Sequence, residues 1–172
     1  AIQRNELQSR PEMNRQAKRA AGGTLRLATP ADVVAIERIV RTAYAGYLDR
    51  IGKPPGPMLD DYAALVAEGV VRVLEDAHGL VGILVLLPQP GHLLLDNVAV
   101  APERQGEGIG RRLLEAAEAE AMQRGFDELR LYTNAAMHEN LAMYPRLGWE
   151  EYGRAEQAGY QRVFFRKRLS LS

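Results

Sequence analysis

The chain has 172 residues, of which 47% are hydrophobic and 26% are charged, a composition typical of one globular domain. It contains no cysteine, which excludes disulfides, thiolate zinc sites and cysteine nucleophiles. Lys plus Arg and Asp plus Glu both number 22, so the net charge is zero and the basic excess typical of nucleic-acid binding is missing.

The first 23 residues differ in composition from the rest of the chain. Basic residues outnumber acidic ones there, and few side chains are large and apolar, so the segment can bury little surface. We therefore expect residues 1–23 to form a basic tail, or a helix that uses a partner's surface, and residues 24–172 to form the folded domain. The tail has no apolar core of a secretory signal, and no apolar run approaches the ~20 residues of a membrane span, which predicts a cytoplasmic protein.

The amino-terminal half of the domain predicts one strand, two helices and an antiparallel meander. Alternating apolar and polar residues predict a strand over residues 24–28. Thr29 and Pro30 then open a helix, with Thr as N-cap and Pro at the first helical position. The further elements expected here are a proline-rich loop over residues 51–57, a helix over 59–67 and strands over 70–75, 80–87 and 92–100.

The carboxyl-terminal half alternates helices and strands. A helix is expected over residues 110–124, a strand over 128–133, a helix from about Ala136, and strands over 149–154 and 161–168. The complete order is β-α-α-β-β-β-α-β-α-β-β. It predicts an α/β fold, with a mixed, twisted sheet of about seven strands flanked by helices and antiparallel in its amino half.

A glycine-rich turn separates the strand at residues 92–100 from the helix at 110–124. Gly106, Gly108 and Gly110 leave room for a ligand to approach the backbone, and a helix N-terminus favours an anion, so we expect a phosphate there. The Gly-Lys-Ser/Thr of a nucleotide P-loop is missing. The G-x-G-x-G spacing and the preceding meander also disfavour a dinucleotide fold.

Two motifs of the chain resemble the GNAT N-acetyltransferase superfamily. The first is Gln105-x-x-Gly108-x-Gly110 behind an apolar strand that ends in Val100-x-Pro102, and the second is Asn140-x-x-x-Tyr144-x-x-x-Gly148-Trp149. The resemblance covers about residues 24–169. It implies the acyl-CoA N-acyltransferase fold, acetyl-CoA as co-substrate, and transfer of its acetyl group to a primary amine.

The resemblance also implies a set of cofactor-binding residues. Backbone N–H groups of the turn, with Arg111, would hold the pyrophosphate; Arg104 and Arg112 are alternatives for a phosphate contact. The backbone of the preceding strand would pair with the pantetheine, and the Val98 N–H would polarise the thioester carbonyl. Met137 stands where the family often has Asn, so Asn140 is expected to bond the pantetheine instead. The full expected set is Val98, Ala99, Val100, Gln105, Gly106, Gly108, Gly110, Arg111 and Asn140.

The implied reaction is direct attack of an unprotonated amine on the thioester. Tyr144 matches the general acid of the family and would protonate the departing sulfur, although Pro145 directly after it predicts a kink that affects where its hydroxyl points. Asp96 is expected on the strand face of Val98 and Val100, where it would take the amine proton directly or through water. His92 and water alone are alternatives. No metal site is expected.

The acceptor is expected opposite the cofactor, beside the proline-rich loop. The residues around that loop are Tyr44, Tyr47, Met58, Asp61 and Tyr62, and aromatic rings with a carboxylate suit an amine cation. The expected partners are a small-molecule or peptide amine and a second copy in a homodimer. Two alternatives stay open: another acyl-CoA or acceptor specificity on the same fold, and a catalytically weak CoA-binding sensor or assembly domain.

Overall fold

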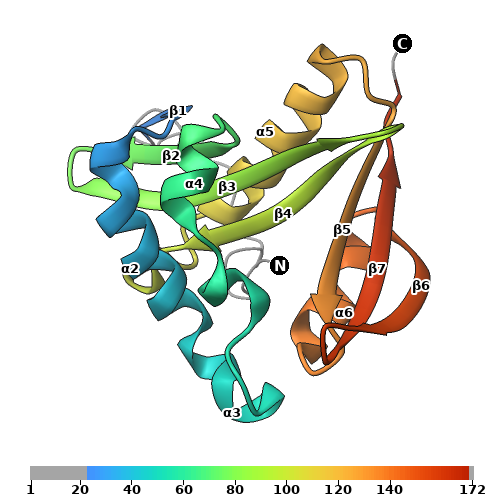
Figure 1. Cartoon of the computed structure of the whole chain (residues 1–172). Helices are drawn as coiled ribbons and strands as arrows, with labels where there is room; N and C mark the ends of the chain where they lie inside the picture. Colours follow the sequence, from blue (N-terminus) through green and yellow to red (C-terminus); the bar gives the residue numbers. More distant parts are fainter. Residues whose placement is uncertain (1–22, 171–172) are drawn as a thin grey trace.

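The structure, a computed structural model, describes residues 23–170, so the tail predicted over 1–23 lies, apart from Gly23, outside the described residues. Within this part of the chain seven strands form one sheet in the order β1-β2-β3-β4-β5-β7-β6 (Figure 1). Strands β1 to β4 are antiparallel, and β4 and β5 are parallel. The predicted fold class is therefore confirmed.

The strands are β1 (Thr24–Leu27), β2 (Val71–Asp76), β3 (Gly79–Gln89), β4 (His92–Val100), β5 (Glu128–Asn134), β6 (Glu150–Gln157) and β7 (Tyr160–Arg168). The α-helices are α2 (Val33–Tyr44), α3 (Leu48–Ile51), α4 (Tyr62–Ala67), α5 (Ile109–Gln123) and α6 (His138–Arg146), with 3₁₀ turns at Pro30–Asp32, Ala45–Tyr47, Gly56–Leu59 and Pro102–Arg104. No helix of the described residues is both long and apolar enough to cross a membrane.

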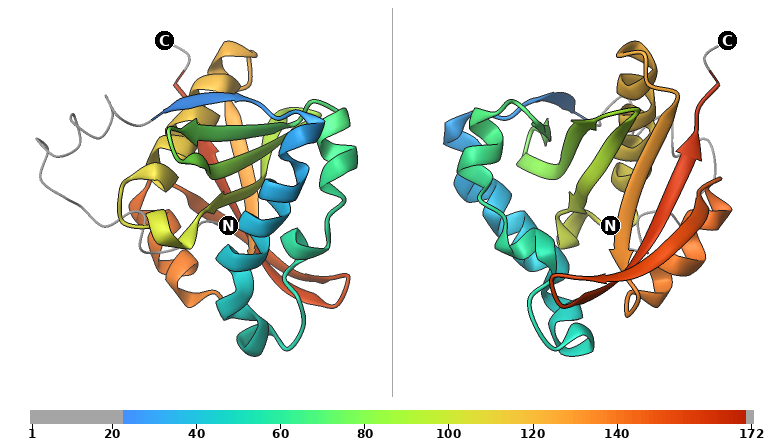
Figure 2. Two further views of the ribbon diagram at one scale, coloured as in Figure 1. Left: turned by 90° about the vertical axis from the view of Figure 1, so that its left-hand side faces the viewer. Right: turned by 45° about the vertical axis from the view of Figure 1, so that its right-hand side comes forward.

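Helices cover both faces of the sheet, and each face has its own core (Figure 2). Helix α2 packs with α4 against β3 and β4, where Ile36, Tyr44 and Ala99 are buried. Helix α5 lies on the opposite face, where Val98, Val100 and Leu113 are buried. Adjacent residues of β4 thus point into different cores, as the period of a strand requires.

Local hydrogen bonds shift three predicted helix starts. The Asp32 carboxylate accepts from the Thr29 N–H at 2.7 Å, which closes a 3₁₀ turn at Pro30–Asp32, so α2 begins at Val33 and not at Pro30. Asp61 caps α4 by accepting from the Ala64 N–H at 3.1 Å, so that helix begins at Tyr62 and not at residue 59.

The start of α6 follows the same logic. The Asn134 side chain accepts from the Ala136 N–H at 2.9 Å and closes a turn two residues long, so α6 begins at His138 and not near Ala136. At the other end, Pro145 lies inside α6, and the helix ends one residue later, at Arg146. The proline removes one backbone N–H donor from this last turn.

Strand β4 carries a bulge that the sequence pattern did not predict. The adjacent residues Val85 and Leu86 of β3 pair with Asn97 and Leu95, which leaves Asp96 as an extra residue. Leu95 and Val98, three positions apart, consequently point into the same core. The prediction that Asp96 shares the face of Val98 and Val100 is therefore wrong, because an inserted residue breaks the alternation.

Candidate active site

The parallel ladder between β4 and β5 stops after two residue pairs, Leu93 with Leu129 and Leu94 with Arg130. Beyond them the two strands diverge (Figure 1). The Ala101 N–H donates to the Val81 carbonyl at 2.9 Å, so residues 99 and 101 direct their backbone groups toward β3. Val98 and Val100 therefore direct theirs toward the side where the β5 ladder has ended. Ala99, expected beside them, directs its backbone toward β3.

The glycine turn follows directly from this strand. Gly106 and Gly108 have φ of +80° and +83°, a left-handed backbone that side chains other than glycine adopt at a cost. Gly108 is the N-cap of α5, and a Cβ built on it would meet no atom within 4 Å. The turn therefore offers an open approach to the backbone at the positive end of a 15-residue helix. Gln105 closes the preceding 3₁₀ turn, and Gly110 lies in the first turn of α5.

The three arginines near this turn differ in their partners. Arg104 pairs with Asp76 at 2.6 Å and with Glu107 at 2.9 Å, and Arg112 donates to the Gly23 carbonyl at 2.9 Å. Within residues 23–170, no hydrogen bond or ion pair engages the Arg111 side chain. Of the three, Arg111 is therefore the one whose side chain is available for a phosphate contact.

The bulge directs Asp96 and Asn97 to the side of α2, where Asn97 joins a buried hydrogen-bond network. The Tyr44 hydroxyl donates to Asn97 Oδ1 at 2.7 Å and approaches the Val98 carbonyl oxygen at 3.1 Å. Asn97 Nδ2 in turn donates to the Tyr62 hydroxyl oxygen at 3.1 Å. Burial raises the pKa of the Tyr44 phenol well above its ordinary value, so the group stays protonated.

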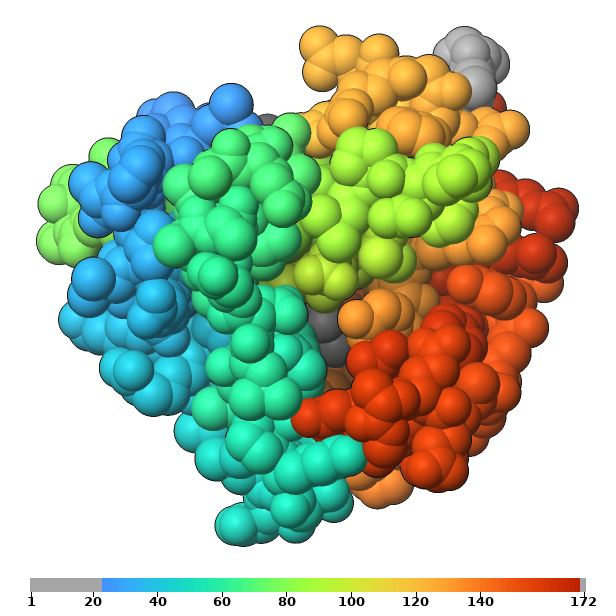
Figure 3. Space-filling model, in the orientation of Figure 1, coloured from blue at the N-terminus to red at the C-terminus, as the bar shows by residue number. Residues whose placement is uncertain are grey.

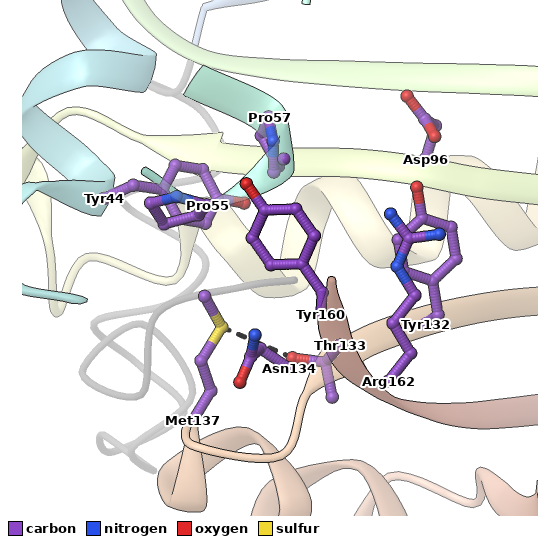
Figure 4. A pocket seen from close by; sticks show the side chains of 11 residues that line it. Tyr44, Pro55, Pro57, Asp96, Tyr132, Thr133, Asn134, Met137, Tyr160 and Arg162 are labelled. Atoms are coloured by element: carbon purple, nitrogen blue, oxygen red, sulfur yellow. Dashed lines mark hydrogen bonds between the residues drawn. The ribbon is translucent and has the colours of Figure 1, made fainter. Parts of the chain in front are cut away.

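Asp96 lines a pocket between the proline-rich loop and the diverging strands (Figure 4). Its lining residues are Tyr44, Pro55, Gly56, Pro57, Asp96, Tyr132, Thr133, Asn134, Met137, Tyr160 and Arg162. Burial raises the pKa of Asp96, while the nearby Arg162 charge acts in the opposite direction. Desolvation and the charge of Asp96 raise the pKa of nearby Asp60 to about 6. This pocket favours a cation beside Asp96.

Side chains close the pocket from the side of α3. Lys53 Nζ donates to the Gly159 carbonyl at 2.7 Å, and the Tyr160 hydroxyl donates to the Pro54 carbonyl at 2.6 Å. Arg50 also pairs with Glu139 of α6 at 2.7 Å. In the space-filling view, the segment around α3 meets the β6–β7 hairpin across the opening (Figure 3). The pocket therefore has a restricted opening, with mostly apolar and aromatic walls.

Asn140 is buried behind the pocket. Its Nδ2 donates to Thr133 Oγ1 at 3.3 Å and approaches Met137 Sδ at 3.5 Å, and both partners line the pocket. Its Oδ1 has no hydrogen-bond partner among residues 23–170, although the side chain is 1% exposed. A buried acceptor without a donor costs free energy, which fits a ligand that supplies an N–H.

Tyr144 is fully buried despite the proline that follows it. Its ring packs against Trp149 and Phe165, with centroids 5.8 and 5.5 Å away. Its phenol lies near enough to Tyr44 to contribute to the raised pKa of that residue. Tyr144 belongs to the core on the α5 side of the sheet, which also contains the side chains of Val98 and Val100.

The remaining expected residues divide between the site and the scaffold. Tyr44 lines the pocket and Tyr62 supports Asn97, whereas Asp61 caps a helix and Met58 packs in the core. His92 begins β4 at the end where β4 and β5 pair, outside the lining of the pocket. No cluster of residues suited to a metal ion occurs among residues 23–170.

Sequence reasoning missed four residues at or next to the pocket: Tyr132, Tyr160 and Arg162 line it, and Asn97 hydrogen-bonds to Tyr44, which lines it. Three of them lie on β5 and β7, far along the chain from Asp96. One signal in the sequence could have predicted the bulge in β4. Asp96 and Asn97 are two adjacent polar residues inside an apolar strand, and such a break in the alternation is typical of a bulge.

This fold, with a strand edge that leads into a glycine turn, is that of an acyl-CoA N-acyltransferase. The chain matches the acetyltransferase (GNAT) family over residues 35–149, more than half its length, and belongs to that family. It is 45% identical to N-alpha-acetyltransferase 80 of Mus musculus over 65 residues, or 38% of this chain and 19% of that protein. The chain therefore spans about a fifth of the length of the mouse protein.

Two solved structures share the fold over most of their length. The ribosomal-protein-S18-alanine N-acetyltransferase from Escherichia coli has a TM-score of 0.69 and 22% identity, with 87% of this chain and 95% of that chain covered. The PaiA N-acetyltransferase from Thermoplasma acidophilum, in complex with coenzyme A, has a TM-score of 0.65 and 16% identity, with 84% and 98% covered.

Proposed function

We propose that this protein is an acetyl-CoA-dependent N-acetyltransferase that moves an acetyl group to a primary amine of a small molecule or peptide. The observation that carries the proposal is the outward-facing backbone of Val98 and Val100, which leads directly into the left-handed glycine turn at the start of α5. Such an edge suits an amide-bearing chain, and such a turn suits a pyrophosphate. Coenzyme A carries both groups, and the family and the named relatives support the same assignment.

The residues present fit this co-substrate. We assign the pyrophosphate to backbone N–H groups between Gln105 and Gly110, aided by Arg111, and the pantetheine amides to Val98 and Val100. The unpartnered Oδ1 of Asn140 is the acceptor we assign to a further pantetheine N–H. Acetyl-CoA supplies the activated acetyl group when bound.

The first experiment is thermal denaturation with and without acetyl-CoA. Because the ligand binds the folded chain alone, a concentration 100 times its Kd adds ~2.7 kcal/mol of stability. For a domain of this size that corresponds to a rise of roughly 5–10 °C in Tm. An unchanged Tm at saturating acetyl-CoA would reject the assignment.

Replacing Asn140 with Leu is expected to weaken acetyl-CoA binding about tenfold. Leucine keeps the buried volume but removes the Oδ1 acceptor that we assign to a pantetheine N–H. A hydrogen bond of this kind contributes ~0.5–1.5 kcal/mol. The folded protein without ligand should lose little stability, since the loss of the 3.3 Å bond from Nδ2 to Thr133 Oγ1 is offset by the removal of the unpartnered Oδ1. Calorimetric titration with acetyl-CoA measures the change; a Kd within twofold of wild type would remove Asn140 from the site.

For the chemistry, we assign proton donation to the departing sulfur to the Tyr144 hydroxyl, and proton acceptance from the amine to Asp96. The support for Asp96 is its place in the pocket and its raised pKa, which improves its basicity. The Val98 N–H, which faces away from β3, is the donor we assign to the thioester carbonyl oxygen. Tyr44, hydrogen-bonded to Asn97 and Val98, holds this end of the strand in position.

Replacing Asp96 with Asn is expected to lower turnover about tenfold at pH 7, with a smaller loss at higher pH. A free amine of pKa ~8 is mostly protonated at pH 7 and needs a base, whereas at pH 9 solvent has already removed that proton. The rate–pH profiles of both proteins, recorded at saturating acetyl-CoA, measure the effect. Equal profiles would assign the proton to water.

A second candidate function is a CoA-binding sensor or assembly domain with little turnover. The observation in its favour is the complete burial of Tyr144 between Trp149 and Phe165, which is typical of a structural tyrosine. Release of free thiol from acetyl-CoA over a panel of amines and peptides separates the two functions. A cytoplasmic location, a homodimer and a separate tail over residues 1–23 also belong to the proposal, and gel filtration with and without the tail tests the last two.

A further inference from the structure

The pocket beside the strand edge contains one group of each charge. Among its described lining residues, Asp96 is the one carboxylate and Arg162 the one cation (Figure 4). The other lining residues are tyrosines, prolines, Met137 and small or uncharged polar residues. The position of Asp96 is explained by the proposed reaction, which needs a base for the amine. The same reaction, as proposed above, gives Arg162 no role.

Arg162 is held in place but not neutralised by an ion pair. Its guanidinium stacks over the Tyr132 ring, with 4.3 Å between the guanidinium carbon and the ring centroid, and its Nη1 donates to Gln157 Oε1 at 3.0 Å. Two neighbouring arginines behave differently: Arg130 pairs with Glu128 at 2.6 Å and Arg166 with Glu150 at 3.4 Å. Within residues 23–170, Arg162 has no carboxylate within ion-pair distance.

Tyr132 connects the two charged groups. Its hydroxyl points toward Asp96 (Figure 4) while its ring supports Arg162, so one residue of β5 lies between a carboxylate from β4 and a guanidinium from β7. Stacking on an aromatic face fixes the plane of a guanidinium and leaves its edge available for hydrogen bonds. A guanidinium has five N–H donors, of which Gln157 accepts one.

We propose that the acceptor carries a carboxylate a few bonds from its amine, and that Arg162 binds this carboxylate while Asp96 holds the amine. The inference rests on the proposed function and adds to it the chemical class of the acceptor. A planar, fixed guanidinium binds a carboxylate through two parallel hydrogen bonds, the geometry that Lys cannot provide. Two sources share this chemistry: a free amino acid, and a peptide with an acidic residue next to its terminal amine.

The experiment measures acceptor binding by calorimetry with CoA present, so it requires no turnover. The first pair of probes is leucine and leucinamide, which differ in the carboxylate of a free amino acid. The second pair is the amidated peptides Ala-Glu-Ala and Ala-Gln-Ala, which differ in a side-chain carboxylate beside the terminal amine. We expect at least a tenfold preference for the carboxylate in one of the pairs, and the pair that shows it identifies the source.

Variants then test whether Arg162 is responsible. Arg162→Gln is expected to reduce the preference to within twofold, and Arg162→Lys to restore only part of it. Arg166→Gln is the matched control, because Arg166 lies on the same strand at 5.6 Å from the Tyr152 ring but outside the pocket lining. That variant should keep the full preference. The rise in Tm on addition of acetyl-CoA is measured for all three variants to check that they fold. We expect it to equal that of wild type.

Two outcomes would overturn the inference: carboxylate and amide probes that bind wild type equally in both pairs, or a preference that survives Arg162→Gln. The wild-type comparison alone decides the matter if a variant does not fold. A carboxylate preference without any acetyl transfer would retain the inferred site and reject the proposed enzyme. Acetyl transfer without a carboxylate preference would retain the proposed enzyme and reject the inferred carboxylate site.

Discussion

Replacing Gly108 with Ala is expected to lower acetyl-CoA affinity at least tenfold, a loss of ~1.4 kcal/mol or more. The added Cβ would project into space that contains no atom within 4 Å, at the N-cap of α5. In the proposed complex, that space belongs to the pyrophosphate. A methyl group there keeps the phosphate oxygens away from the backbone N–H groups, whose bonds to an anion depend steeply on distance.

The substitution also carries a cost that has nothing to do with the ligand. With φ at +83°, an alanine is strained by ~1–2 kcal/mol, so the variant should melt a few degrees lower even without acetyl-CoA. A bulkier valine at this position would add more strain, which makes alanine the better test. Affinity from calorimetry, rather than Tm alone, therefore measures the effect on binding.

Gly125 provides a matched control at the opposite end of the same helix. It has φ of +82° and no atom within 4 Å of its built Cβ, so Gly125→Ala imposes the same backbone strain away from the turn. Both variants should lose similar stability, and only Gly108→Ala should lose affinity. An affinity within threefold of wild type for Gly108→Ala would show that this turn is not the phosphate site.

The difference between these two glycines illustrates what sequence alone can establish. A glycine turn between an apolar strand and a helix predicts an anion site from local backbone chemistry, and the structure has the expected left-handed residues there. The succession of the seven strands along the chain follows as reliably, because each element shows its own periodicity over several residues. Sequence patterns therefore predict those features that depend on residues near one another in the chain.

The direction of Asp96 depends on something that periodicity cannot detect. Counting by twos placed its side chain with Val98 and Val100, and the bulge instead directs it to the side of Tyr44. One inserted residue reverses the face of everything before it. As a consequence, a carboxylate lies in the pocket and not on the core face.

The rest of the pocket arises from contacts across long stretches of chain. Tyr160 reaches the Pro54 carbonyl and Lys53 the Gly159 carbonyl, each across 106 residues. Arg162 alternates with buried Val163 as in any half-buried strand, so its pattern gives no indication of a ligand. Such residues become recognisable only once the divergence of β4 and β5 brings their strands to one opening.

Tyr144→Phe is expected to keep acetyl-CoA affinity and lower turnover about 10²-fold, the typical contribution of a general acid. The ring contacts with Trp149 and Phe165 survive the change, so folding and cofactor binding should be preserved. The hydroxyl, which we assign to the departing sulfur, is lost. Because an ordinary phenol, with a pKa of ~10, keeps its proton at neutral pH, a phenol is suited to donate a proton there.

The pH dependence and a second tyrosine distinguish this role from a structural one. Without the hydroxyl, the sulfur must take a proton from solvent, so the deficit of Tyr144→Phe should grow as pH rises from 7 to 9. Tyr44→Phe is the comparison: it removes a buried hydroxyl of the same chemistry, hydrogen-bonded to Asn97 and the Val98 carbonyl, and should alter stability and acceptor KM more than turnover. Turnover of Tyr144→Phe within threefold of wild type, with acetyl-CoA still bound, would assign Tyr144 to the aromatic core and favour the sensor function.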